Sequence, residues 1–371
     1  MSDQKPRYLS LDVFRGATVC LMITVNNPGE WGIQYGPLQH ARWHGLTLTD
    51  MVFPAFLFAV GNAMAFAMGK YEQQGNTIFW GKILKRSFLI FLIGYLLQWF
   101  PFYDFGSSSV IPISAVRIPG VLQRIALCYL LASVLIHYCT RKQVIGTSLF
   151  ILLGYWCILY FFGMAPDPFS ITSYVGNAID ISIFGAERIY NGEGVPFDPE
   201  GLLSTLPAVV NVVLGYFTGM YIRKQNNSYE TIAKLMLAGG AMILVALFWD
   251  LFFPINKKIW TSSYTIITSG ICMSILAMLI YLIEMKQIKH WTYFFEVFGK
   301  NPLFIYIVSW VLATFYYTIR VGDGSLNGAI IEGLKSYMTP ANASLLFAIL
   351  FTLLNWFIGY VMDKKKIYIK V

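Results

Sequence analysis

The sequence predicts an all-α fold: a polytopic integral membrane bundle of about ten transmembrane helices, with both termini in the cytoplasm. Composition is the first observation, because 57% of the 371 residues are hydrophobic and only 12% are charged, whereas soluble domains carry about 25% charged residues. The second is that the hydrophobic residues form runs of about 18 to 23, long enough to cross a ~30 Å hydrocarbon core. Barrel strands alternate over about 10 residues, so these uniformly apolar runs are expected to be helices, which satisfy their own backbone in lipid.

Short polar loops join the apolar runs, and a single transmembrane domain over residues 1–371 is therefore expected. The predicted helices span residues 8–26, 50–69, 84–101, 117–138, 144–163, 203–223, 231–253, 260–284, 301–319 and 341–363. On one side of the predicted membrane the loops are long and rich in Gly, Pro, Trp and Tyr, at 27–49, 102–116, 164–202 and 320–340. Sites tend to lie on long loops held by a rigid scaffold, so a functional site is expected at that end.

The 27 Lys and Arg residues are unequally divided between the two sides. The loops on the side of the long loops hold Arg42, Arg188, Lys257, Lys258, Arg320 and Lys335, and the predicted helices contain Arg15, Arg117 and Arg124. All the others lie on the side of the two termini. Because cytoplasmic segments carry the excess of Lys and Arg, this distribution places both termini inside and requires an even number of helices.

The same distribution accounts for the net charge of +8 without a nucleic-acid partner. The positive residues follow the membrane orientation rule instead of forming one basic patch. The five cysteines lie within or at the ends of apolar runs and lack the spacing of a disulfide framework or a zinc site. We therefore expect a lipid bilayer as the surroundings of the chain, and no metal.

Three ionisable residues near the ends of the first two predicted helices need an explanation, because charges in a membrane are costly. Asp12 and Arg15 are three residues apart on one helical face and predict a structural ion pair or, alternatively, a site that binds phosphate. Asp50 opens the second predicted helix after Thr47 and Thr49. It is either a helix N-cap or a carboxylate directed at the loop that precedes it.

Two arginines flank the stretch RIPGVLQR at the start of the fourth predicted helix. Arg117 and Arg124 are seven residues apart, which predicts that they share one face of that helix. Arg117 is placed either at the membrane interface, where its long side chain can reach water, or in a polar cavity. Arg124 lies about 10 Å deeper, at 1.5 Å per residue, and a polar cavity is the expectation for it.

His40 and His44 lie in the first long loop, in LQHARWHGLTLTD. A spacing of four could bind zinc on a helix, but Gly45 interrupts the segment and only Asp50 offers a third ligand, so no metal is predicted. A histidine here could instead act as a catalytic base or simply be solvated. His137 and His290 lie at cytoplasmic helix ends, where a cation is favourable.

Several segments, taken in order, resemble one family from end to end. They are RYLSLDVFRG at 7–16 with VNN at 25–27, HARWHGLTLTDMVFPAFLFAVGNAM at 40–64, VRIPGVLQRIALCYLL at 116–131, FDPEGLLSTLPAVVNVVLGYFTG at 197–219, PINKKIWTSSY at 254–264 and GKNPLFIYI at 299–307. The chain thereby resembles the catalytic domain of heparan-alpha-glucosaminide N-acetyltransferases and their bacterial relatives. His44 stands where the animal enzymes have asparagine and adds a second titrating group.

The resemblance implies a transmembrane acyltransferase domain that moves an acetyl group from cytoplasmic acetyl-CoA to the amine of a glucosamine-type sugar on the periplasmic side of a bacterial inner membrane. It implies catalytic roles for His40, Asp50 and Asn26. The substrate- and CoA-binding positions that it implies are Arg117, Arg124, Asp198, Glu200, Asn256, Lys257 and His44. Relatives also suggest a homodimer.

An amine that attacks a thioester must lose a proton, and a histidine with an unperturbed pKa of ~6.5 is a suitable base. Asp50 is expected to orient the imidazole of His40, as carboxylates do in catalytic triads, and Asn26 to donate to the developing oxyanion. CoA is expected to reach His40 through a cavity between helices, with its phosphates held by cytoplasmic basic residues. The alternative is a secondary transporter of amino sugars, although no internal repeat typical of transporters is visible.

Overall fold

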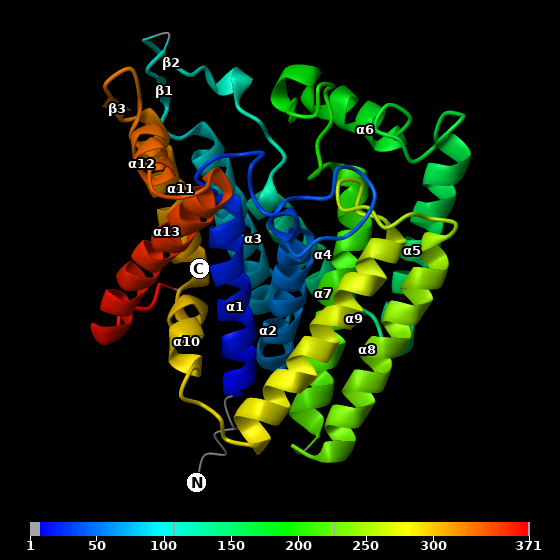
Figure 1. Ribbon diagram of the computed structural model, residues 1–371. Coiled ribbons are helices and arrows are strands. Elements are labelled where there is room, and N and C mark those ends of the chain that lie inside the picture. Colours follow the sequence, from blue (N-terminus) through cyan, green and yellow to red (C-terminus); the bar gives the residue numbers. More distant parts are fainter. Residues whose placement is uncertain (1–7, 107, 226, 370–371) are drawn as a thin grey trace.

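The computed structural model describes residues 8–106, 108–225 and 227–369 and is built almost entirely of helices (Figure 1). The long helices are α1 (Leu9–Asn26), α2 (Val52–Gln74), α3 (Asn76–Trp99), α4 (Val121–Tyr138), α5 (Arg141–Phe162), α7 (Leu202–Lys224), α8 (Tyr229–Asp250), α9 (Ser262–Leu279), α11 (Pro302–Thr318) and α13 (Pro340–Lys364). The shorter ones are α6 (Val175–Phe184), α10 (Thr292–Lys300) and α12 (Leu326–Lys335). The prediction of an all-α polytopic membrane bundle is confirmed.

Each of the ten predicted spans coincides with a long helix, but not every one of these helices is long and apolar enough to cross a membrane by itself. In the part of the chain that the structure describes, eight helices are long and apolar enough to cross a membrane, and nine if the bent pair α10–α11 counts as one span. The remaining predicted span corresponds to α3, which begins at Asn76 and carries Lys82, Lys85 and Arg86 in its first half. These charges leave a shorter apolar stretch toward its C-terminal end.

The outer helices present apolar side chains to the surroundings of the bundle. On α5, Phe150 and Phe161 are 76% and 73% exposed, and on α8, Leu237 and Phe248 are 72% and 67% exposed. Continuous apolar surface of this extent mediates contact with a partner or a membrane. Since α5 and α8 are both long enough to span a bilayer, lipid is the surrounding that fits this surface.

The predicted helix at 301–319 is confirmed as α11, but the short helix α10 that precedes it was not predicted. Helices α10 and α11 meet at Asn301 with a bend of 84°. Pro302 is the first residue of α11, a position where its missing N–H costs nothing, but it disfavours helical geometry in the residue before it. The side chain of Asn301 binds the C-terminal tail instead, donating to the carbonyl of Ile367 and accepting from the amide of Ile369, each at 2.9 Å.

The two ends of the bundle differ in the way that the loop lengths predict. At the upper end in Figure 1, here called the loop-rich end, the connections contain α6, α12 and two small hairpins: β1 (Tyr103–Asp104) with β2 (Ser109–Val110), and β3 (Arg320–Val321) with β4 (Gly324–Ser325). At the opposite end the links are tight: a single glycine, Gly75, separates α2 from α3. The orientation of these ends in a membrane stays a prediction. Arg7, the first residue of the motif RYLSLDVFRG, lies outside the described residues.

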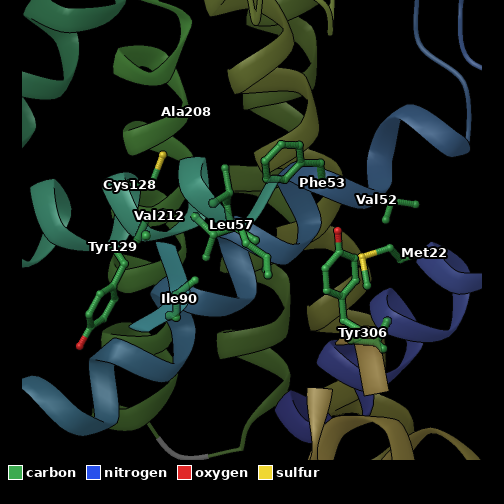
Figure 2. Close-up of a cluster of buried hydrophobic side chains, with 14 of the residues drawn as sticks. Met22, Val52, Phe53, Leu57, Ile90, Cys128, Tyr129, Ala208, Val212 and Tyr306 are labelled. Atoms are coloured by element: carbon green, nitrogen blue, oxygen red, sulfur yellow. The ribbon is translucent and has the colours of Figure 1, made fainter. Parts of the chain in front are cut away.

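Helix α7 lies at the centre and packs closely on α2. A Cβ added to Gly61 of α2 would lie 1.9 Å from the carbonyl oxygen of Val212, and one added to Gly215 of α7 would lie 2.1 Å from that of Phe58. Small residues allow this close approach of membrane helices. The buried cluster in Figure 2 joins α2, α4 and α7 through Leu57, Cys128 and Val212, which fixes the helix ends that carry the site.

The predicted ion pair near the N-terminal end of α1 is confirmed. Arg15 Nη2 lies 2.7 Å from Asp12 Oδ1. The same guanidinium donates to the backbone carbonyl of Gly299 at the end of α10, through Nε at 2.9 Å and Nη2 at 2.5 Å. The Asp12–Arg15 pair therefore connects α1 to α10.

Candidate active site at the loop-rich end

Asp50 organises the loop that precedes α2. It lies in a 3-10 turn, Thr49–Met51, at the head of α2 and is 1% exposed. Its carboxylate accepts hydrogen bonds from His40 Nδ1 at 2.7 Å, the amide of Ala41 at 3.0 Å, and the hydroxyl and amide of Thr47 at 2.8 and 3.1 Å. The carboxylate does not cap its own helix, so the N-cap interpretation is wrong. It is directed at the preceding loop, as the alternative proposed.

His40 lies next to a carboxylate and a lysine: its Nδ1 atom contacts Asp50, and Lys257 lies beside the ring. With the carboxylate on Nδ1, a neutral imidazole carries its proton there and leaves the lone pair on Nε2. Lys257 Nζ lies 3.0 Å from Nδ1, 3.3 Å from Nε2 and 3.7 Å from Asp50 Oδ1. Burial lowers the pKa of Lys257, while Asp50 opposes that shift. Because the His40 side chain is 38% exposed, the ring is held in place yet open to a ligand.

Arg117 clamps the loop before α7. Its Nε and Nη2 bind the two oxygens of Asp198 at 2.9 and 2.6 Å, and Nη2 also reaches Glu200 at 2.5 Å. Asp198 is fully buried and accepts the amides of Tyr190 and Glu200, each at 3.0 Å. Bidentate contacts of this kind fix geometry as well as charge.

The prediction that Arg117 and Arg124 share one helix face is wrong. Helix α4 begins only at Val121, because Pro119 and Gly120 keep the preceding chain extended, so Arg117 lies in a loop. Arg124 is in α4, 1% exposed, and donates to the carbonyl of Gly201 at 3.0 Å and to the hydroxyl of Ser204. Its guanidinium also lies 5.0 Å from the ring centre of Trp260. Both arginines therefore bind the segment 198–204, from different elements.

Asn256 and His44 lie next to the site and contact each other. Asn256 is fully buried, accepts from the amide of Ile259 at 3.1 Å and faces His44 Nδ1 with its side-chain amide nitrogen at 3.3 Å. This turn carries Lys257 toward His40. Burial lowers the pKa of His44, with Asp167 and Asp250 opposing, so His44 favours the neutral form.

Two cavities meet at His40. The inner cavity, about 250 Å³, lies between the ends of α1, α2, α3, α4 and α11, and the outer cavity, about 170 Å³, lies toward the loops. Four side chains line both of them: His40, Arg117, Glu200 and Lys257. The remaining lining of the outer cavity is Ala41, Trp43, Asp50, Tyr190, Glu193, Pro199, Lys258 and Trp260.

Amide and phenol groups add to the polar lining of the inner cavity. Asn26, at the end of α1, lines it together with Gln98 of α3, Gln123 of α4 and Tyr306 of α11. Tyr306 and Met22 appear side by side in Figure 2. The cavity reaches Leu303, next to the α10–α11 bend. A further cleft of about 500 Å³ shares Asn26, Gln98 and Tyr306 with it and extends toward Trp31.

The structure thus brings together most of the predicted site residues and adds others. His40, Asp50, Arg117, Glu200 and Lys257 lie around one point, and Asn26 faces the inner cavity. The lining of the two cavities does not include Arg124, Asp198, Asn256 or His44. Arg124 and Asp198 contact the lining residues Trp260 and Arg117, whereas Asn256 and His44 contact each other. The cavity-lining residues Trp43, Glu193, Lys258, Gln98 and Gln123 were not predicted as site residues. Only the two glutamines, as amides within apolar runs, carried a recognisable signal.

One family profile and two known proteins match this chain, and all three carry the same enzyme name. The family profile "Heparan-alpha-glucosaminide N-acetyltransferase, catalytic" matches residues 7–236. The chain is 28% identical to the heparan-alpha-glucosaminide N-acetyltransferase of Homo sapiens over 427 aligned positions, which cover 100% of this chain and 61% of the human protein. The Mus musculus protein of the same name is also 28% identical, over 98% of this chain and 60% of its own length. The chain therefore spans about three fifths of the relatives it matches.

Proposed function

Because this chain belongs to the family of heparan-alpha-glucosaminide N-acetyltransferase catalytic domains, we propose that it is a membrane-embedded acetyltransferase acting on the amine of a glucosamine-type sugar. Residues 1–371 would form one transmembrane acyltransferase domain. The observation that carries the proposal is the position of His40, oriented by Asp50 and exposed to two cavities at once. A base between two chambers suits a reaction that joins two substrates.

The donor in this proposal is acetyl-CoA, with its acetyl end in the inner cavity. That cavity combines apolar walls with the amides of Asn26, Gln98 and Gln123, which suits a pantetheine arm with its own amide groups. The Nε2 atom of Gln123 has no hydrogen-bond partner among the described residues, and a ligand amide would supply one. The CoA phosphates would bind basic residues at the opposite end of the bundle, which we expect to face the cytoplasm because it carries the excess of Lys and Arg.

The chemistry follows from the two faces of the imidazole. His40 Nε2 takes a proton from the acceptor amine, whose nitrogen attacks the thioester carbon. The carbon–sulfur bond then breaks, and the CoA sulfur leaves with the proton returned by the imidazolium. Asp50 stabilises the imidazolium and keeps Nε2 directed outward. Asn26 and Lys257 are the nearby donors proposed for the oxyanion. An acetyl-His40 intermediate would use the same atoms in two steps.

The test uses purified full-length protein in liposomes with acetyl-CoA and glucosamine. We expect release of CoA and N-acetylglucosamine, identified by mass spectrometry. His40→Ala should abolish both products, whereas His290→Ala, an exposed residue at the opposite end, should leave them unchanged. Full activity in a folded His40→Ala variant would overturn the assignment. Accumulation of unmodified glucosamine without CoA release would favour the transporter.

A second experiment tests the orientation. We expect the loop-rich end to face the periplasm of a bacterial inner membrane. With the native cysteines replaced, Gly322→Cys in the β3–β4 turn should react with a membrane-impermeant maleimide in cells whose outer membrane is permeable, and His290→Cys should react only after lysis. The reverse pattern would reject this orientation and with it the cytoplasmic donor.

A further inference from the structure

The outer cavity has a charge pattern that limits the acceptor. Three cations line it, and each has a carboxylate of the same wall within 4 Å: Arg117 with Glu200 at 2.5 Å, Lys257 with Asp50 at 3.7 Å, and Lys258 with Glu193 at 2.7 Å. The described lining therefore has no cation without a carboxylate neighbour. A sulfate or carboxylate entering this space would have to displace one of these pairs and would meet the remaining carboxylates.

The Glu193–Lys258 pair is placed to bind hydroxyl groups. Both side chains are partly exposed, 23% and 17%, and both line the outer cavity. Lys258 Nζ is also held by the carbonyl of Arg42 at 3.0 Å and lies 5.8 Å from the ring centre of Trp43. A carboxylate and an ammonium side by side can accept from one sugar hydroxyl and donate to another.

Aromatic side chains complete the walls. The indole of Trp43 is fixed by a hydrogen bond from Nε1 to the carbonyl of Phe169 at 2.9 Å. Tyr190 lies across the guanidinium of Arg117, whose Cζ is 5.1 Å from the ring centre. Rigid aromatic groups offer amphipathic contact surface at low entropic cost. The volume of about 170 Å³ is below the roughly 300 to 1,000 Å³ of pockets for drug-sized ligands, so it suits a single sugar residue.

We propose that the outer cavity is the acceptor site and that it selects an amino sugar with an uncharged, hydroxyl-bearing body, with Glu193 and Lys258 binding the hydroxyls and the amine directed at His40. This inference rests on the proposed acetyltransferase function. It goes beyond the family name in one respect: a sulfated or uronate-bearing acceptor is disfavoured. Glu193 is then a specificity-determining residue for the acceptor and plays no part in donor binding.

The experiment compares glucosamine with glucosamine 6-sulfate as acceptors for the purified full-length protein. We expect wild type to use glucosamine with a kcat/KM at least about tenfold higher. Glu193→Gln should raise the KM for glucosamine about tenfold, the effect of losing a hydrogen bond to a charged group, and should narrow the preference against the sulfated sugar. Tyr190→Phe, which removes one hydroxyl from the wall, should raise this KM severalfold. The matched control is Glu187→Gln, an exposed carboxylate of the same loop outside both cavities.

The donor side provides an independent measurement. Slow release of CoA from acetyl-CoA without acceptor should be the same in wild type, Glu193→Gln and Glu187→Gln. Absence of acetylated glucosamine and of CoA release in wild type would reject the proposed function. Acetylation by wild type, combined with an unchanged KM in both Glu193→Gln and Tyr190→Phe or with a preference for the sulfated sugar, would reject the acceptor site alone.

Discussion

Replacing Asp50 by asparagine tests how the site holds His40. The carboxylate receives four hydrogen bonds, from the ring of His40, the amide of Ala41, and the amide and hydroxyl of Thr47. Asparagine keeps the shape but turns one acceptor oxygen into an NH2 group, which would face one of these donors. Either an N–H of the loop loses its partner, or His40 changes tautomer and presents a protonated Nε2 to the substrate.

The expected magnitudes follow from these two losses. Loss of a hydrogen bond to a charged, buried group costs about 2 kcal/mol of stability. Loss of the correct tautomer and of imidazolium stabilisation costs roughly 10³- to 10⁴-fold in kcat, about 4 to 5.5 kcal/mol. The fold should survive, because Tyr264 still donates to the backbone carbonyl of Asp50 at 2.6 Å.

The assay is CoA release with glucosamine present, together with thermal unfolding in detergent. The matched control is Asp323→Asn, an exposed carboxylate in the β3–β4 turn at the same end of the bundle, which should change neither quantity. If folded Asp50→Asn protein keeps activity within tenfold of wild type, Asp50 does not set the state of His40, and the proposed chemistry fails.

Two further predictions concern stability. Gly61→Ala places a Cβ 1.9 Å from the carbonyl of Val212 and should destabilise the protein by about 2 kcal/mol, measured by thermal unfolding; Gly154→Ala, which meets nothing within 4 Å, should not, and equal effects would refute the close α2–α7 packing. Burial raises the pKa of Asp180 to about 6, above its unfolded value, so its contribution to stability is full below pH ~4 and is lost as pH rises through about 6, by up to about 3 kcal/mol. Asp180→Asn should therefore show a flatter stability profile between pH 4 and 6.5, and identical profiles would contradict the shift.

The helices were predictable because membrane spans are encoded locally. About 20 consecutive apolar residues define a span without knowledge of its neighbours. The break at Asn301 was missed because residues 291–300 contain Glu296 and Lys300 and look like a cytoplasmic loop. The pattern around Pro119 and Gly120 did contain the signal that delays α4 to Val121, and the position of Arg117 could have been predicted from it.

The site was less predictable because it is assembled from distant segments. His40, Arg117, Asp198 and Lys257 come from four loops, and only the resemblance to a family placed them together. Charged loop residues carry little information by themselves, since most are solvated, and Glu193 and Lys258 therefore escaped notice. Their significance depends on which cavity they line, which is a property of the folded chain.

The pairing of charges explains how a polar site can lie at the end of an apolar bundle. Isolated charges near lipid are expensive, but the cations around His40 each lie beside a carboxylate, and Asp198 is saturated by Arg117 and two amides. The carboxylates are thus occupied by these cations and amides. The imidazole of His40 lines both cavities, and the neighbour of its Nε2 atom is Lys257. If the proposal is correct, two substrates from different compartments need share only this ring. The protein would then transfer an acetyl group across the membrane without moving either substrate across it.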